Sequence, residues 1–427
     1  MRFIHTADIH LGYQQYGFKD RFNDFSEVFL CIVDQALEQE VDFMLLAGDL
    51  FHKRTVAPLA MRVAIEGLKR LKEAEIPVLS VEGNHEAAYY RDQYSWMEFL
   101  DAMDYVSLLN PRFEKGEAIL SPYSDAGGAY VDLPEGVRVY GLKYYGASTG
   151  NAVQSFAESL SELETDGVRH SILMMHAGLE GQLAHTGRLK LDHIALLKEQ
   201  IDYLALGHIH KPYTVGGCLY NPGSPETCGM DEVAWPERGY YLVDVDSGGN
   251  PRHNAELLAP PRRPFHRFRL EVDALTTPNK VYDAVRRLIR RESKKVQSEP
   301  APVIELMLAG VLPFNRYELE LDYIRGLLED AWSPLTARVQ SKITPADFDI
   351  DLDVDASRSV LEINVLRELF ERDNRFREHA EAWAEGAVDL KRMVLEDADP
   401  RAVVEHLQEL HSTLPFEFEG QGKKEVA

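Results

Sequence analysis

Long apolar runs, cysteine and positive charge are all scarce in this 427-residue sequence. No run approaches the roughly 18 apolar residues of a membrane-spanning helix, so we expect no such helix. Cys31, Cys218 and Cys228 lack metal-ligand spacing, which favours inert thiols in a reducing compartment over a disulfide framework. The first expected strand starts almost at Met1 and leaves no room for a signal peptide, so we expect a cytoplasmic protein.

Basic residues number 46 against 70 acidic ones, which gives a formal net charge of −24. A field of that sign repels nucleic acid, so a DNA-binding protein of this composition must concentrate its basic residues. One concentration lies at 262–295, where eleven basic residues meet only four acidic ones. Four arginines within it recur at helical spacing and form a stripe that suits either DNA contact or a solvated helix face. They are Arg286, Arg287, Arg290 and Arg291.

Five polar blocks follow short runs rich in Val, Ile, Leu and Met. Such runs, bounded by Gly or polar residues, predict buried strands, and helical stretches such as 25–40 and 58–74 lie between them. Strand–helix–strand sheets gather ligand sites at the carboxyl ends of their strands, so distant blocks can converge. The blocks contain Asp8 and His10, Asp49 and His52, Asn84 and His85, His176, and finally His208 and His210.

The residue types in these blocks are metal ligands. Mixed imidazole, carboxylate and amide donors suit a site for Mn, Fe or Zn and are not the donors of a thiolate site. One carboxylate can bridge two ions that together clamp an in-line displacement at phosphorus, and we assign this bridging role to Asp49. The other expected ligands are Asp8, His10 and His210 for one ion, and Asn84, His176 and His208 for the second.

Two histidines of the blocks are not needed as ligands. Phosphodiester cleavage requires protonation of the leaving alkoxide, and imidazole suits that task near neutral pH. We therefore assign His85 as a general acid or transition-state stabiliser. His52 would orient the scissile phosphate or assist His85.

Taken together, the blocks resemble the calcineurin-like metallophosphoesterase superfamily. Their extensions further resemble the SbcD-type DNA-repair nucleases, the meiotic-recombination-eleven family, closely over 1–245 and loosely beyond. These extensions are DIHLG at 8–12, GDLFHKRTVAP at 48–58, GNHE at 83–86, GHIHKP at 207–212 and YNPGSPE at 220–226. Glu86 departs from many family nucleases, which carry Asp at this position, so GNHE alone does not separate a nuclease from a phosphatase.

The resemblance implies an α/β protein: a metallophosphoesterase β-sandwich flanked by helices, with a smaller α+β capping domain and a helical C-terminal tail. It implies two-metal hydrolysis of DNA at double-strand breaks, as a 3′–5′ double-strand exonuclease and single-strand endonuclease. Two Mn²⁺ per subunit are the implied cofactors, with Fe or Zn as alternatives. The implied partners are double-stranded DNA ends, single-stranded DNA, a second copy of the chain and an SbcC-type (Rad-fifty-like) ABC ATPase, in the cytoplasm at the nucleoid.

Composition suggests where the domains divide. We expect the nuclease domain to span 1–258, with its last strand at 239–246 and a proline-rich linker at 259–264. Alternating strand and helix patterns over 265–345 predict a compact second domain. The resemblance implies that this is the capping domain, which helps to bind DNA. Helical periodicity at 358–372 and 389–411 predicts a tail within 356–427. Family resemblance assigns this tail to ATPase binding; the alternative is a helical pair packed on its own body.

Basic and aromatic residues near the metal blocks are candidates for phosphate contact. Apolar stripes at 25–40 and 94–109 suit either a dimer interface or the core. The candidate DNA contacts are Lys19, Arg21, Lys53, Arg54, Tyr90 and Arg91.

Two other functions share part of this pattern. A phosphatase or cyclic-nucleotide phosphodiesterase acting on a small substrate would use the same metal ligands, but it needs neither a basic cap nor a helical tail. A protein that only tethers DNA ends would need neither His85 nor the full ligand set. The combination therefore favours the nuclease.

Overall fold

The computed structural model describes residues 1–88, 94–183, 189–246, 248–249, 252–296, 299–345, 358–371, 376–396 and 398–414. Two compact units divide the chain, Met1–Arg263 and Pro264–Ala427. Among the described residues, no helix is both long enough and apolar enough to cross a membrane.

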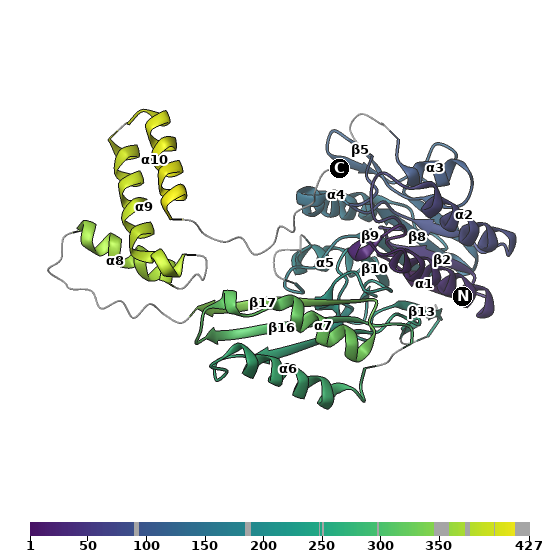
Figure 1. Ribbon diagram of the computed structural model, residues 1–427. Coiled ribbons are helices and arrows are strands. Elements are labelled where there is room, and N and C mark those ends of the chain that lie inside the picture. Colours follow the sequence, from purple (N-terminus) through teal and green to yellow (C-terminus); the bar gives the residue numbers. More distant parts are fainter. Residues whose placement is uncertain are drawn as a thin grey trace, which may run out of the picture. The chain divides into compact units, whose positions relative to one another are not determined.

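A six-stranded mixed sheet forms the first half of unit 1 (Figure 1). Its central strands are parallel, and two antiparallel strands close one side. The last strand of this domain was expected at 239–246, but a further strand, His253–Leu258, follows it, so the sheet is one strand wider than the sequence predicted. In order, the strands are β14 (His253–Leu258), β13 (Tyr240–Val245), β1 (Arg2–Thr6), β2 (Phe43–Leu46), β3 (Val78–Ser80) and β4 (Ser107–Leu108).

A second six-stranded sheet packs against the first. The layer between them is apolar and fully buried, with Phe3 and Phe43 from the first sheet and Ile172 and Met174 from the second. This face-to-face packing confirms the expected β-sandwich. In order, the second sheet's strands are β11 (Tyr213–Val215), β12 (Leu219–Asn221), β10 (Tyr203–Gly207), β9 (His170–His176), β8 (Val137–Leu142) and β7 (Tyr130–Leu133).

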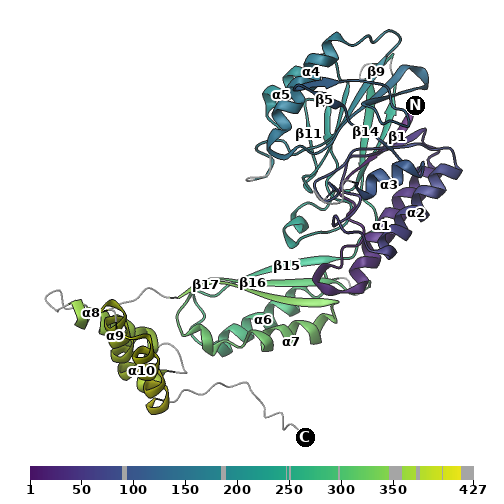
Figure 2. The same cartoon turned by 90° about the horizontal axis from the view of Figure 1, so that it is seen from above.

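Helices cover both outer faces of the sandwich, as Figure 2 shows. The first sheet carries α1 (Lys19–Glu38), α2 (Pro58–Glu73) and α3 (Trp96–Ala102), and the second carries α4 (Thr149–Glu162) and α5 (Leu191–Leu197). A helix was expected over 94–109, but the observed helix α3 is shorter: it ends at Ala102, and the chain then enters β4. A hairpin of β5 (Arg112–Glu114) and β6 (Glu117–Ile119) lies beside α4. Short 3₁₀ turns occur at Gln15–Gly17, Pro134–Gly136, Gly146–Ser148, Met230–Ala234, Arg316–Glu318 and Arg377–His379.

Unit 2 begins with the alternating pattern that the sequence predicted. Three parallel strands form a sheet in the order β15, β16, β17, and both helices lie on one face of it (Figure 2). Apolar residues on the two helices and the sheet form its separate core. The elements are β15 (Phe265–Glu271), α6 (Pro278–Glu292), β16 (Val303–Leu312), α7 (Leu321–Trp332) and β17 (Thr336–Pro345).

The tail contains α8 (Arg358–Glu371), α9 (Ala380–Leu395) and α10 (Pro400–Thr413). A single helix over 389–411 was expected, and this is wrong because the chain starts a new helix at Pro400. Proline has no backbone N–H and disrupts a helix interior, but it suits the first helical turn. The Asp399 side chain caps the new helix by accepting a hydrogen bond from the Arg401 N–H.

Candidate dimetal centre

The seven expected ligands meet at one edge of the sandwich. Four follow parallel strands of the first sheet, and three end or follow strands of the second. Because these strands present their carboxyl ends at the same edge, residues about 200 positions apart become neighbours. Asp8 and His10 follow β1, Asp49 follows β2, Asn84 follows β3, His176 ends β9, and His208 and His210 follow β10.

The backbone is left-handed at four of these positions. The φ angle is 54° at Asp8 and at His10, 55° at Asp49 and 88° at His208. Such a conformation costs roughly 1–3 kcal/mol at a residue other than glycine, and it persists where the surroundings hold the chain in place. Here the Asp8 N–H donates to the Gly48 carbonyl at 3.1 Å, which ties two strand ends together. Strain concentrated on the expected ligands indicates a functional site.

Glycine is required beside two ligands for steric reasons. A Cβ on Gly83 would overlap Oδ1 of Asp49, and a Cβ on Gly48 would overlap Nδ1 of His176. Gly48 also has a φ of 85°, which other residues rarely adopt. The glycines of the GD and GN motifs therefore let the side chains of neighbouring strands approach each other.

The first expected ligand group is assembled around His10. Its Nε2 faces Nε2 of His210 at 3.0 Å. Ligand atoms of Asp8, His10 and Asp49 all lie within 4.8 Å of one another, and all three residues are buried. The His208 backbone N–H donates to both carboxylate oxygens of Asp8, at 3.1 and 3.0 Å, and so fixes that side chain.

The second expected group is assembled around the Asn84 side chain. Its Oδ1 lies 3.0 Å from Nε2 of His176 and 2.9 Å from Nδ1 of His208. Nε2 of His176 is also 3.4 Å from Oδ2 of Asp49. Asp49 thus touches both groups, as expected for a carboxylate shared by two ions.

The surroundings of His176 suit a cation. Its Nδ1 donates to the Ala47 carbonyl at 2.8 Å, and its Nε2 faces Oδ1 of Asn84 and Oδ2 of Asp49. Burial disfavours the imidazolium, yet the Asp49 carboxylate raises the pKa of His176 to about 9. Burial likewise raises the pKa of Asp8 to about 6, against the opposing effect of His176. The Asp49 carboxylate thus favours positive charge at His176, and the same set of donors would suit a metal ion.

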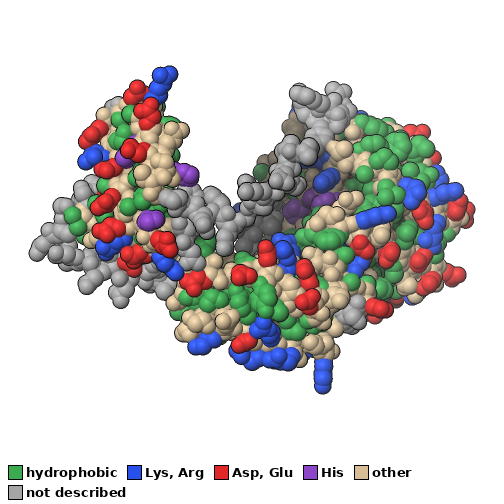
Figure 3. Space-filling model, in the orientation of Figure 1, with side chains coloured by type: hydrophobic (Ala, Val, Ile, Leu, Met, Phe, Trp, Pro, Cys, Tyr) green, Lys and Arg blue, Asp and Glu red, His purple; other side chains and the backbone are tan. Residues whose placement is uncertain are grey.

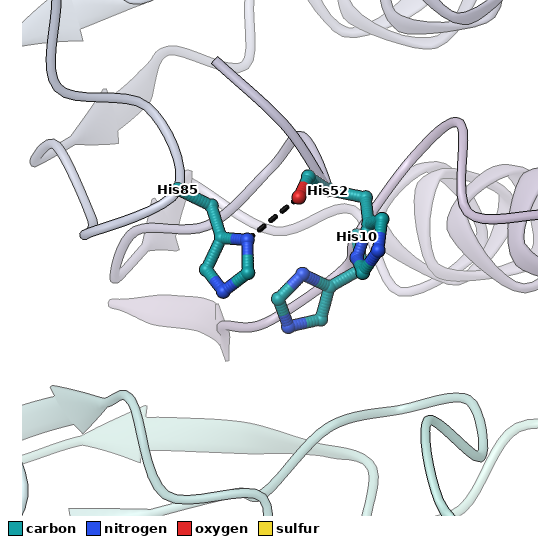
Figure 4. Close-up of side chains that lie close together, drawn as sticks. All are labelled: His10, His52 and His85. Carbon is teal, nitrogen blue, oxygen red and sulfur yellow. Dashed lines mark hydrogen bonds between the residues drawn. The ribbon is translucent and has the colours of Figure 1, made fainter. Parts of the chain in front are cut away.

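His52 and His85 lie beside this centre, as Figure 4 shows. Nδ1 of His85 donates to the His52 carbonyl at 2.6 Å, which leaves its Nε2 toward the site, 4.0 Å from Oδ2 of Asp49. The His52 ring stacks on Tyr13 with 3.7 Å between centroids. Burial, and then the charges of His85 and Lys53, lower the pKa of His52 to about 4. His52 is therefore neutral near pH 7.

Glu86 is a site residue whose role the sequence did not reveal. Its carboxylate accepts backbone N–H groups from Asp49 at 3.0 Å, Gly83 at 2.9 Å and Phe51 at 3.1 Å. Burial, and then repulsion by Asp49, raise the pKa of Glu86 to about 8. The residue that departs from the family pattern thus ties together the two loops that carry Asp49 and Asn84.

Glu86→Gln is expected to lower the free energy of unfolding by about 1–3 kcal/mol. Both side-chain oxygens of Glu86 accept backbone N–H groups, so the side-chain NH₂ group of glutamine would face a donor and leave it without an acceptor. The pKa of Glu86 is about 8 in the folded protein, whereas the ordinary pKa of a glutamate is 4.5, so folded Glu86 keeps its proton over this range. Its contribution to wild-type stability therefore falls as the pH rises through that window, and glutamine lacks this slope. Denaturant titrations across pH measure both effects, with Glu66→Gln on the exposed face of α2 as control. Equal stability of the wild type and the Glu86 variant would contradict this role.

Two further residues near His210 were missed because only tertiary structure brings them there. Glu232, from the Met230–Ala234 turn, accepts from Nδ1 of His210 at 2.7 Å. Cys228 was expected to be a thiol without ligand neighbours, but its sulfur lies within 4.8 Å of ring nitrogens of His10 and His210. The only signal in the sequence is that both residues follow the YNPGSPE motif.

The candidate DNA contacts divide into three groups. Lys19, Lys53 and Arg54 are exposed. Tyr90 and Arg91 lie outside the described residues. Arg21 must be corrected: its guanidinium is fully buried between Asp24 and Glu226 and is not available to a DNA backbone. A partner so far away in the sequence could not be foreseen.

The chain is similar to several known proteins. Residues 1–212 match the family model described as calcineurin-like phosphoesterase. The DNA double-strand break repair protein Mre11 of Saccharolobus solfataricus is 30% identical over 57% of this chain and 60% of its own length. The Mre11 protein of Sulfolobus acidocaldarius is 26% identical over 77% of this chain and 81% of its own. A dimetal phosphatase structure from Danio rerio matches 57% of this chain and 92% of its own, with 11% identity and a TM-score of 0.35.

The chain spans less than two thirds of the first of these relatives. Its matched region nevertheless includes every expected metal ligand, since the family model ends at residue 212. The His and Asp clusters form a site of the dimetal phosphoesterase type. The chain therefore belongs to the calcineurin-like phosphoesterase family, and within it resembles the Mre11 DNA double-strand break repair proteins.

Proposed function

We propose that this protein is a metal-dependent nuclease that processes the ends of DNA double-strand breaks. The observation that carries the proposal is the meeting of two ligand groups at Asp49, with His85 and His52 beside them. Similarity to Mre11 repair proteins supports DNA as the substrate. We propose 3′–5′ exonuclease action on double strands and endonuclease action on single strands.

Asp8, His10 and His210 would hold one ion, Asn84, His176 and His208 the other, and Asp49 would contact both. We propose two Mn²⁺ as the ions, although Fe or Zn would also suit these donors. When bound, such a pair supplies a reactive hydroxide and offsets charge on the attacking and leaving oxygens.

His85 is proposed to hold the proton for the leaving oxygen at Nε2. Its Nδ1 already donates to the His52 carbonyl, which fixes the ring and aims Nε2 into the site. The ring is partly open to solvent, with 37% of the side chain exposed, so a substrate can reach it.

His52 is proposed to orient the scissile phosphate. It is neutral near pH 7, so it would act as an N–H donor and not as a cationic acid. Stacking on Tyr13 fixes the ring plane. Within the described part of the chain, its Nδ1 is buried without a hydrogen-bond partner.

Lys53 and Arg54 are proposed to contact the DNA backbone, because both are exposed and adjoin His52. Replacing both with glutamine should weaken DNA binding alike for all sequences. It should also reduce the slope of log affinity against log salt by about 1 per residue. Binding titrations at several salt concentrations measure this, with Lys69 and Arg62 on the exposed face of α2 as matched controls. A slope unchanged from the wild type would remove these residues from the interface.

Residues 265–345 are proposed to form the capping domain and to bind DNA. The α6 face of unit 2 carries Lys and Arg side chains (Figure 3). Arg287 and Arg290 are exposed, whereas Arg286 pairs with Asp283 at 2.8 Å. The arginine stripe thus retains cationic side chains that can meet phosphate.

Residues 356–427 are proposed to bind an SbcC-type ABC ATPase. Several apolar side chains on the tail helices are solvent-exposed: Val360 by 45%, Leu369 by 44%, Val404 by 53% and Leu407 by 48%. Contiguous exposed apolar surface commonly marks an interaction site.

Deletion of the chain beyond residue 345 should abolish co-purification with the ATPase and leave metal-dependent DNA cleavage near the wild-type rate. The catalytic residues all lie in unit 1, so cleavage has no need of the tail. Pull-down and nuclease assays on the same preparations check both expectations. Retention of the ATPase by the shortened chain would refute the tail assignment.

A homodimer is also proposed. The apolar stripe of α1 is buried within its own unit, so it serves the core. The segment at α3 differs, since Tyr94, Trp96 and Met103 are 52%, 41% and 50% exposed. These side chains are the better candidates for contact with a second copy.

The nuclease is tested against the small-substrate alternative by one pair of assays. Purified protein with manganese should degrade duplex DNA from its 3′ ends and leave a small phosphomonoester almost untouched. Rapid hydrolysis of the phosphomonoester with intact DNA would favour a phosphatase. Tight DNA binding without any cleavage would favour a tethering protein.

A further inference from the structure

The outer ring nitrogens of two expected metal ligands have different partners. Nδ1 of His176 donates to the neutral carbonyl of Ala47 at 2.8 Å. Nδ1 of His210 instead donates to the carboxylate of Glu232 at 2.7 Å. Glu232 is buried, with 5% of its surface exposed. Of these two ligands, therefore, Nδ1 of His210 contacts a buried carboxylate, whereas Nδ1 of His176 contacts a neutral carbonyl.

The Glu232 carboxylate is itself held in place. Its second oxygen accepts from the Cys228 N–H at 2.9 Å and lies 3.4 Å from Nε of Arg238. Arg238 also donates to the Glu232 carbonyl at 2.6 Å and to the Trp235 carbonyl at 2.9 Å. A side chain fixed at both oxygens cannot turn away from His210 without breaking these bonds.

The linker residue Arg262 extends this arrangement. Its guanidinium donates to the Arg238 carbonyl at 2.8 Å and to the Pro236 carbonyl at 2.5 Å. The backbone around Arg238 is thus anchored by the end of unit 1.

The YNPGSPE motif holds His210 from the other side. The amide of Asn221 donates to the Ile209 carbonyl at 2.7 Å and to the Lys211 carbonyl at 2.9 Å, on either side of His210. The backbone of His210 is therefore fixed by Asn221, and its ring is fixed by Glu232. No other feature of the proposed mechanism uses this motif.

We propose that Glu232 is a positioning residue that strengthens His210 as a ligand of the first metal ion. A hydrogen bond from Nδ1–H to a carboxylate fixes the tautomer, aims the Nε2 lone pair inward and makes the ring more basic. The effect falls on the ion held with Asp8 and His10, and the ion held by His176 and His208 is spared. The proposal rests on the proposed dimetal centre.

Manganese titration of the full chain tests the proposal. The electron paramagnetic resonance signal gives the concentration of free Mn²⁺, and the bound ion is the difference from the total added. Glu232→Gln keeps the side-chain shape and removes the charge. It should raise the Kd of one manganese by about 10- to 100-fold and leave the other unchanged. The matched control is Glu237→Gln, which removes the same charge from an exposed position of the same segment.

The outcomes separate this proposal from the proposed function. If the wild type fails to bind two manganese ions, the dimetal centre itself is wrong. If the wild type binds two and Glu232→Gln binds both equally well, only the role of Glu232 is overturned. Thermal melting of metal-free protein shows whether the variant folds. If Glu232→Gln melts at a lower temperature than the wild type, Glu232→Asp is used in its place. Aspartate keeps the charge, but its shorter side chain does not reach Nδ1 of His210. The same rise in the Kd of one manganese is therefore expected. Wild-type affinity in the folded aspartate variant also overturns the proposal.

Discussion

Asp49→Asn is expected to lower DNA cleavage by at least about 10³-fold and to remove bound manganese. Loss of an outer partner of a metal ligand typically costs 10- to 100-fold, and Asp49 is a direct candidate ligand of both ions, so its loss must cost more. Although burial opposes ionisation, His176 holds the pKa of Asp49 below its usual value, so the carboxylate is charged in the folded protein. The neutral amide removes that charge from the point where both groups meet.

The design of this variant keeps the surrounding fold. Asparagine can still accept the His85 backbone N–H, which donates to Oδ1 of Asp49 at 2.9 Å. Asp244→Asn is the matched control, because Asp244 forms a surface ion pair with Arg2. Exposed pairs of this kind contribute little to stability. Metal content and cleavage are measured on the same samples. A manganese-loaded, active Asp49 variant would refute the shared-ligand assignment.

His85→Ala is expected to reduce cleavage by about 10²- to 10⁴-fold, the usual contribution of a positioned general acid. Manganese stoichiometry and DNA affinity should stay at wild-type values. The reason is that the closest contact of Asp49 with His85 is the hydrogen bond from the backbone N–H at 2.9 Å, which alanine retains, whereas the ring lies 4.0 Å away. The variant therefore separates proton transfer from metal binding.

The loss of cleavage rate is measured under single-turnover conditions, so that product release does not limit the observed rate. His379→Ala, in the exposed tail turn, controls for removal of an imidazole elsewhere. Intact turnover by the His85 variant, with metal still bound, would show that another group protonates the leaving oxygen.

The candidate ligands could be predicted from the sequence because two local rules combine. Residue type identifies a possible ligand, and its position just after an apolar strand places it at a sheet edge. The left-handed backbone at Asp8, His10 and Asp49 is a further geometric sign of a functional site, and the residue types at these positions do not predict it. Neither rule needs knowledge of which sheet each strand joins.

Burial and partnership could not be predicted in the same way. Arg21 looked like a basic residue next to a metal block, but it pairs with Glu226 in the interior. Glu232 and Cys228 reach His210 only because the chain folds back after β12. Contacts of this kind depend on packing between distant segments, for which the local sequence carries no periodic signal.

The predicted limits of a tail helix were wrong where a single residue overrode the apolar pattern. The stripe over 389–411 continues through Pro400, yet the helix cannot, because proline lacks the N–H that an interior turn requires. A proline inside an apolar helical pattern therefore marks a helix boundary that the periodicity alone does not show.

The most direct test of the two-metal centre is an anomalous difference map from crystals grown with manganese. Two peaks are expected beside Asp49. One should lie with Asp8, His10 and His210, and the other with Asn84, His176 and His208. A single peak, or peaks away from Asp49, would contradict the centre proposed for this protein.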